Sequence, residues 1–190
     1  DDANRDPLWS RGLGDVYKRQ VLGHVLLHQT INGNEAILQM EQAGDYPDII
    51  VGCTGGGSNL AGLMFPFLGQ QLRGGQKIDI IGCEPLSCPS FTKGKYAYDH
   101  GDMARMTPLI KMHTLGSDFL PPANHSGGLR YHGMSYHLSH LYDLGLMRAK
   151  AYGQKDCFEA GVIFGKQEGI IPAPEGNHAV KGAIDAALEC

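Results

Sequence analysis

Short apolar runs alternate with longer stretches of mixed polarity over residues 47–85, and this alternation predicts the first structural unit. The run PDIIVGC (47–53) has the length and β-branched content of a buried strand. A stretch with apolar residues at helical spacing begins at Ser58 and ends near residues 74–75, and KIDIIGCEP (77–85) is a second apolar run. A strand, a helix and a strand in this order predict two parallel strands with a right-handed crossover.

The flanking segments extend this pattern in both directions. Residues 21–30 are apolar and fit either a strand or a helix, and residues 34–44 fit an amphipathic helix with Gly44 at its C-terminal end. Residues 86–147 are rich in Gly, Pro and His and predict ordered loop with a short helix near 134–143. A helix over 154–168, a strand at GIIPA (169–173) and a helix over 177–189 complete the prediction. The fold class is therefore α/β, an open parallel sheet with helices on both faces.

The first 20 residues differ from the rest of the chain. They mix charges with Gly and Pro without periodicity, and the run RGLGDVYKRQ (11–20) resembles translated sequencing-adapter read-through. We therefore expect residues 1–20 to be a non-native leader and residues 21–190 to form one partial α/β domain. Because the last predicted helix has no C-terminal cap, we also expect the chain to stop in mid-structure.

Composition excludes several classes of function. The chain has 190 residues and a net charge of −4, without a basic stripe, so a nucleic-acid partner is not expected. No apolar run approaches the roughly 20 residues of a membrane span, and no signal-peptide pattern is present. Five scattered cysteines without a CxxC pair predict free thiols and a cytoplasmic location.

The stretch VGCTGGGSNL (51–60) carries the main candidate chemistry. A strand, a glycine loop and a helix N-terminus together favour an anion, because the first helical N–H groups have no intrahelical partner and the helix dipole is positive there. The glycines let the backbone approach a phosphate closely, and Ser58 is expected to cap the helix and to donate its hydroxyl. The sequence therefore predicts a phosphate site.

Other phosphate motifs fit less well. A P-loop needs a lysine after the glycines, and none follows here. A dinucleotide fingerprint needs GxGxxG and a later acid, and Gly52, Gly55 and Gly57 fit it poorly. Glu84, at the end of the next strand, lies further along than the usual ribose-binding acid but could imitate it. A non-catalytic phosphate- or nucleotide-binding α/β domain stays open as the alternative.

Histidine pairs and nucleophile motifs add no second site. His24 and His28 lie four residues apart, and His137 and His140 three apart, but neither pair has a third ligand at a motif's spacing. No GxSxG sequence marks a serine nucleophile. We expect no metal site.

Two motifs together carry a family resemblance. GGGSN (55–59) after an apolar strand, with GIIPAPEGNHA (169–179) downstream, resembles the β subunits of tryptophan synthase, which are pyridoxal-phosphate enzymes of the tryptophan-synthase (type II) fold. The segments HTLGSDFLPP (113–122), HSGGLRYHGM (125–134) and LYDLG (141–145) resemble the second, divergent branch of that family. The similarity runs from about Val21 to the last residue.

The resemblance implies the site residues. It places the phosphate of pyridoxal 5'-phosphate on Gly55, Gly56, Gly57, Ser58 and Asn59, and it places Glu175 beside the cofactor ring. From the residues alone, the favoured interpretation of Glu175 is a first-turn acid that complements the dipole of the last helix, and the resemblance reverses this preference. Where the common branch has an aspartate followed by an aromatic residue near the substrate, this chain has Arg130 and Tyr131, which puts the substrate in question.

The resemblance also implies the reaction. It is a lyase-type β-replacement of aromatic amino-acid biosynthesis, in which L-serine and indole give L-tryptophan and water. The Schiff-base lysine of the family should lie in a segment like SHKxN upstream of the glycine loop, but Lys18 lies in the leader and every other lysine follows the loop. We therefore expect a C-terminal fragment with no catalytic residue of its own and no turnover. A homodimer and an α subunit are the partners that the resemblance suggests.

Overall fold

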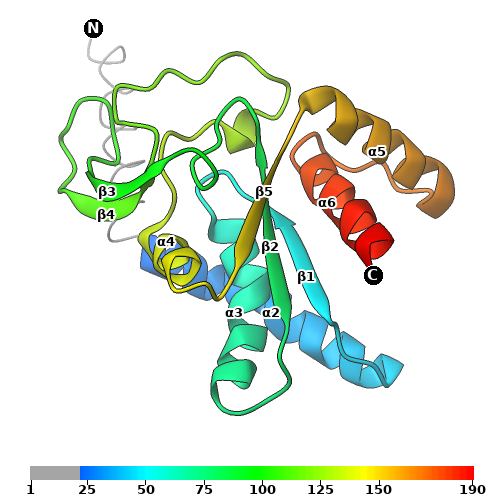
Figure 1. Cartoon of the computed structure of the whole chain (residues 1–190). Coiled ribbons are helices and arrows are strands. Elements are labelled where there is room, and N and C mark those ends of the chain that lie inside the picture. Colours follow the sequence, from blue (N-terminus) through cyan, green and yellow to red (C-terminus); the bar gives the residue numbers. More distant parts are fainter. Residues whose placement is uncertain (1–21) are drawn as a thin grey trace, which may run out of the picture.

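The computed structural model describes residues 22–190, so the predicted leader, residues 1–20, lies outside the described part of the chain. Helices and strands mostly alternate along the chain, and one β-hairpin lies in the middle (Figure 1). In order they are α2 (Leu22–Ala43), β1 (Ile49–Cys53), α3 (Ser58–Leu72), β2 (Asp79–Pro85), β3 (Lys95–Asp99), β4 (Ile110–Thr114), the 3-10 turn η3 (Gly127–Leu129), α4 (Tyr136–Asp143), β5 (Arg148–Tyr152), α5 (Gln154–Glu168) and α6 (Gly176–Glu189).

The main sheet has three parallel strands in the order β1-β2-β5. Gly52 of β1 lies beside Gly82 of β2, which lies beside Ala149 of β5. The predicted parallel pair at 47–53 and 77–85 is thus confirmed, and α3 is the crossover helix between them. Because all three strands run in one direction, their carboxyl ends lie at one edge of the sheet, from which the glycine loop emerges.

Helices cover both faces of this sheet, as predicted: α5 and α6 lie on one side, and α2, α3 and α4 on the other (Figure 1). Successive residues of β2 point to opposite faces. Ile80 belongs to the core on the α3 side, whereas Ile81 packs with Ala186 of α6. Gly182 of α6 approaches Cys83 so closely that a Cβ would lie 2.2 Å from the cysteine sulfur.

The α2 helix forms a second layer against α3. Gly33 of α2 meets the backbone of Leu63, and Gly62 of α3 meets Gln29; a Cβ on either glycine would lie within 2.5 Å of the other helix. This close approach brings the N-terminal part of α2 to the glycine loop. The two segments predicted at 21–30 and 34–44 are therefore one continuous helix, and Gly44, with φ +69°, follows its end as predicted.

The prediction was wrong at two places, and it also missed β5, the third strand of the main sheet. Residues 95–114 contain an antiparallel hairpin, β3–β4, where the sequence predicted loop. The segment GIIPA (169–173) is not a strand: no described strand pairs with it, and Ile171 is 92% exposed. The helices predicted at 134–143, 154–168 and 177–189 are confirmed as α4, α5 and α6. Among the helices of residues 22–190, none combines the length and apolar character that a bilayer crossing requires.

Candidate functional site

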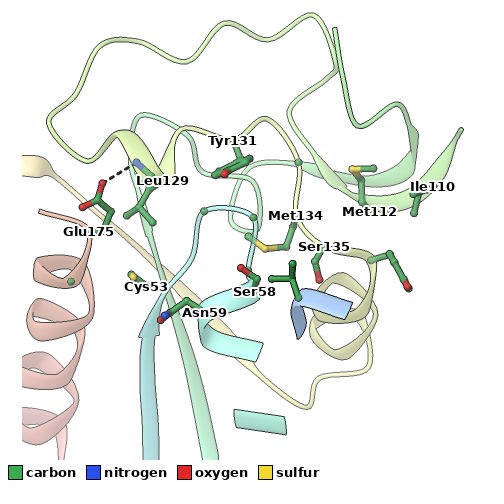
Figure 2. Close-up of a pocket in the computed structure, with 18 residues that line it drawn as sticks. Cys53, Ser58, Asn59, Ile110, Met112, Leu129, Tyr131, Met134, Ser135 and Glu175 are labelled. Atoms are coloured by element: carbon green, nitrogen blue, oxygen red, sulfur yellow. Dashed lines mark hydrogen bonds between the residues drawn. The ribbon is translucent and has the colours of Figure 1, made fainter. Parts of the chain in front are cut away.

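A cavity of about 590 Å³ opens at the carboxyl edge of the sheet, and all six residues predicted for the site line it (Figure 2). Its walls come from the glycine loop, the start of α3, β4, the 127–136 segment and the start of α6. The lining residues are Val25, Cys53, Gly55, Gly56, Gly57, Ser58, Asn59, Ile110, Met112, Gly128, Leu129, Tyr131, Gly133, Met134, Ser135, Tyr136, Glu175 and Gly176.

A different structural feature explains the presence of glycine at each of the three positions of the loop. Gly57 has φ +95°, a left-handed conformation that disfavours other residues, and a Cβ there would lie 2.8 Å from the sulfur of Met134. Gly55 packs against the next segment, because a Cβ would lie 2.5 Å from the carbonyl oxygen of Gly128. Gly56 meets no such barrier: the nearest atoms to a Cβ are those of the Tyr131 ring, at 3.9–4.0 Å. A side chain at Gly56 would therefore extend into cavity space.

The N-terminus of α3 opens at this cavity without a side-chain cap. The N-cap residue is Gly57, so the expectation that Ser58 caps the helix is wrong; Ser58 is the first helical residue. The first intrahelical bond runs from the Ala61 N–H to the Gly57 carbonyl, at 3.0 Å. The N–H groups of residues 58–60 therefore lack intrahelical acceptors, and no acidic residue lies in the first turn.

These features fit a phosphate group. Uncapped amides and the positive end of the helix dipole favour an anion, and the Ser58 hydroxyl adds a donor at the same end of the cavity. No lysine or arginine of the described residues lines the cavity, so backbone groups rather than cationic side chains would hold the charge. The missing Cβ of Gly56 leaves room for phosphate oxygens beside the backbone.

Glu175 lies on the opposite side of the cavity from the hairpin (Figure 2). It is the N-cap residue of α6, but its side chain makes no cap hydrogen bond to that helix. Its Oε1 instead accepts a hydrogen bond from the N–H of Gly128, at 2.9 Å. The carboxylate therefore binds across to the η3 turn, and the interpretation of Glu175 as a plain dipole-complementing acid does not describe its contacts.

Cys53, the last residue of β1, also lines the cavity, and the sequence pattern did not single it out. Burial raises the pKa of its thiol, and the nearby Glu175 charge raises it further, although less. The group is therefore a neutral thiol at physiological pH. It is a compact, weakly polar part of the wall between the glycine loop and Glu175.

The remaining wall is mostly apolar and was also missed. Ile110 and Met112 come from β4, and Tyr131 and Met134 come from the segment that packs on the glycine loop. Because the hairpin was not predicted, nothing in the sequence placed β4 beside residues 55–59. The cavity thus combines an anion-binding end with an apolar wall that suits a flat, uncharged ring.

Comparison with known proteins assigns the family. The sequence matches the family model described as "Pyridoxal-phosphate dependent enzyme" over residues 24–190. The chain belongs to this family. Pyridoxal phosphate, the cofactor predicted from the sequence, is thus the cofactor for which the family is named.

Similar proteins within this family carry a more specific name, tryptophan synthase beta chain 2. The protein of that name from Aquifex aeolicus is 57% identical over 173 residues, which are 90% of this chain and 40% of the relative. Those from Methanosarcina mazei and Thermotoga maritima are 54% and 52% identical, over 89% and 97% of this chain. The predicted resemblance to tryptophan synthase β subunits is confirmed, and the chain spans about 40% of the length of these relatives.

The fold itself is also found among solved structures. The crystal structure of a threonine deaminase from T.th. matches with a TM-score of 0.60 and 15% sequence identity, over 86% of this chain and 47% of that chain. This likeness supports the predicted α/β fold class.

Arg130 lies between two residues of the cavity lining but is not part of it. The expectation that it lies near the substrate stays a prediction; its guanidinium donates a hydrogen bond to the carbonyl oxygen of Pro121, at 2.7 Å. The neighbouring Tyr131 lines the cavity instead. In this structure, Arg130 thus holds the loop that precedes the η3 turn.

Glu84, the acid that the nucleotide alternative requires, is fully buried at the end of β2. Its carboxylate accepts hydrogen bonds from the N–H groups of Phe91 (2.9 Å) and Thr92 (2.8 Å) and from the Thr92 hydroxyl (2.6 Å). Burial raises its pKa, although these hydrogen bonds act in the opposite direction. Because Glu84 is committed to the 90–92 turn and does not line the cavity, it cannot hold a ribose there.

The histidines form no metal centre within the described residues. The rings of His24 and His28 meet edge to face, with centroids 4.3 Å apart, on α2. Residues 22–190 contain no group of three or more His, Cys, Asp or Glu side chains placed to hold a metal ion.

Proposed function

We propose that the cavity binds pyridoxal 5'-phosphate, with the phosphate on residues 55–59 and the ring between Glu175 and the apolar wall. The observation that carries this proposal is the uncapped N-terminus of α3, which opens into the same cavity as the Glu175 carboxylate. The membership of the family supports the identity of the ligand. The open space beside Gly56, which has no Cβ, supports the placement of the ligand's phosphate against this loop.

The activity that we propose for the whole polypeptide is the joining of L-serine and indole to give L-tryptophan and water. The names of the similar proteins support it. The cofactor, when bound, supplies an electron sink for the charge that develops on the amino acid. In this chain, the amides of residues 58–60 hold the phosphate, Glu175 fixes the η3 turn, and the apolar wall keeps water from the aromatic substrate.

We also propose that this chain alone does not turn over. No lysine of the described residues lines the cavity, and no lysine of the sequence lies in the context expected for the Schiff-base residue. The partners that we propose for the whole enzyme are a second copy of itself and an α subunit. The five free cysteines suit a reducing cytoplasm.

The test uses pyridoxine 5'-phosphate, which has the ring and phosphate of the cofactor but no aldehyde to react with surface lysines. We expect the chain to bind it, as measured by equilibrium dialysis, and to bind unphosphorylated pyridoxine much more weakly. Gly56→Asp should weaken binding by at least about tenfold, because it places an anion beside the phosphate.

Gly127→Asp is the matched control for this variant. It adds the same charge on the neighbouring η3 turn, at a residue that does not itself line the cavity and where a Cβ meets no atom within 4 Å. Equal binding by both variants would contradict the proposed phosphate position. If inorganic phosphate binds as tightly as pyridoxine 5'-phosphate, the alternative of a plain phosphate-binding domain is favoured instead.

A further inference from the structure

A second hollow lies next to the cavity, between the C-terminal half of α3, the β3–β4 hairpin and α4. We call it the hairpin groove; its volume is about 810 Å³. It shares Ile110 and Tyr136 with the cavity but none of the glycine loop. The lining residues are Phe65, Leu68, Gly69, Leu72, Tyr96, Tyr98, Leu109, Ile110, Lys111, Tyr136, His137, His140 and Leu141.

The groove is apolar and rich in rings. Side chains of its lining stay open to solvent: Leu72 is 65% exposed, Tyr98 69% and Leu109 56%. An exposed apolar surface of this kind is typical of a place that a ligand or further polypeptide covers. Flat aromatic side chains on several sides favour a flat aromatic group, because offset-stacked and edge-to-face contacts stabilise ring pairs.

The charges of the groove all have one sign. No aspartate or glutamate of the described residues lines it, although the chain as a whole has a net charge of −4. The ammonium of Lys111 lies over the Tyr96 ring, 4.3 Å from its centroid, and makes no ion pair with the residues that the structure describes. A cation held on a ring at the edge of an apolar groove can bind an anion without breaking an existing salt bridge.

His137 adds a further ring to the groove. It packs against Tyr136, with centroids 3.9 Å apart. Its Nδ1 is buried without a hydrogen bond among the described residues, so this atom is closed to a ligand as the ring lies. The groove therefore offers one cation, Lys111, within aromatic walls.

We propose that the hairpin groove binds a small carboxylate that carries an aromatic ring, with the ring among the tyrosine and phenylalanine side chains and the carboxylate at Lys111. This site is separate from the phosphate end of the cavity and does not depend on the proposed cofactor. The residues that carry the charge and the rings, Lys111 and Tyr98, are exposed and can be replaced without opening the core.

The experiment titrates the whole chain with 2-naphthoate and with the neutral 2-naphthamide and follows naphthalene fluorescence. We expect naphthoate to bind more tightly than naphthamide. Lys111→Gln should remove this preference, a loss of about three- to tenfold in naphthoate affinity. The control Lys93→Gln removes an exposed lysine outside the groove and should leave binding unchanged.

A second variant and a competitor locate the ring. Tyr98→Ser should weaken naphthoate and naphthamide alike, because it removes an aromatic wall and no charge. Inorganic phosphate should not compete with either ligand, since the glycine loop lies outside the groove. Equal affinity of the chain for naphthoate and naphthamide, or competition by phosphate, would overturn the proposal. A third outcome would also overturn it: neither ligand binds, and the chain self-associates in a way that Tyr98→Ser abolishes. A second copy of the chain would then be what covers the groove.

Discussion

The carboxylate of Glu175 and the N–H of Gly128 are joined by a 2.9 Å hydrogen bond across 47 residues of sequence. The bond ties the start of α6, on one face of the sheet, to the η3 turn above its carboxyl edge. Gly128 lies so close that a Cβ there would be 3.1 Å from Oε1 of Glu175. The contact closes one side of the cavity, so the shape of the site depends on it.

Replacing Glu175 should loosen the η3 turn. We expect Glu175→Ala to lower the free energy of unfolding by about 1 kcal/mol, because the half-exposed carboxylate makes one charge-assisted bond. Glu175→Gln keeps an acceptor oxygen and should cost less. Urea unfolding measures both, and the control is Glu159→Ala, an exposed glutamate on α5 that makes only a solvent-exposed ion pair with Lys155. A loss from Glu159→Ala as large as that from Glu175→Ala would contradict the role of this bond.

Gly57 and Gly74 form a natural matched pair, with φ values of +95° and +93°. Ala at Gly74 meets no atom within 4 Å, so Gly74→Ala should cost only the backbone strain, about 1–2 kcal/mol. Ala at Gly57 adds contacts of 2.8 Å with Met134 and 3.0 Å with Leu138, and should cost about 1–3 kcal/mol more. Thermal and urea unfolding compare the two variants. Equal losses would show that the 134–138 segment moves away without cost.

The elements that local pattern specifies were predictable. The strand at 47–53, the helix from Ser58 and the strand at 77–85 follow from continuous apolar runs and helical spacing, and they position the glycine loop. The identity of the N-cap did not follow, because a serine is the usual capping residue and nothing local reveals that Gly57 adopts φ +95°.

The parts that depend on distant partners were not predictable. β4 has a short alternating sequence, IKMHT, and its pairing with KYAYD becomes visible only once the hairpin is formed. GIIPA has strand-like residues, yet a strand needs a neighbour, and no described strand lies beside it. The apolar wall of the cavity comes largely from such long-range contacts, so the phosphate end was predicted and the wall was not.

Buried histidines should make stability depend on pH. Burial lowers the pKa of His113, His137 and His178 below the ordinary value. In the unfolded chain these groups take up protons below about pH 6.5, whereas the folded state resists protonation. The free energy of unfolding is therefore not reduced by these histidines above that pH. It decreases as the pH falls below it, because protons then bind the unfolded chain more readily than the folded one.

The measurement is urea unfolding at about pH 7.5, 6.5 and 5.5, which spans the ordinary pKa of histidine. We expect the free energy of unfolding to fall on acidification, and His178→Gln should reduce the slope because it removes one of the titrating groups. An unchanged slope in His178→Gln would show that this histidine is protonated equally in both states.

The five thiols should react with iodoacetamide in an order set by burial. Cys190 is exposed and should react first, whereas burial raises the pKa of Cys83 to about 12 and that of Cys157 to about 11. Both should be labelled only after unfolding, because the thiolate is the reactive form. Cys53 is half-buried on the cavity wall, and burial raises its pKa as well, so we expect slow labelling in the native state.

Labelling of Cys53 also reports whether the cavity is filled. Pyridoxine 5'-phosphate should slow the alkylation of Cys53 and leave that of Cys190 unchanged, as followed by mass spectrometry of the digested chain. Cys190 thus serves as the internal control, because it lies outside the cavity lining. If the ligand binds and Cys53 still reacts at its original rate, the ring does not lie between the glycine loop and Glu175, and a different orientation of the cofactor is required.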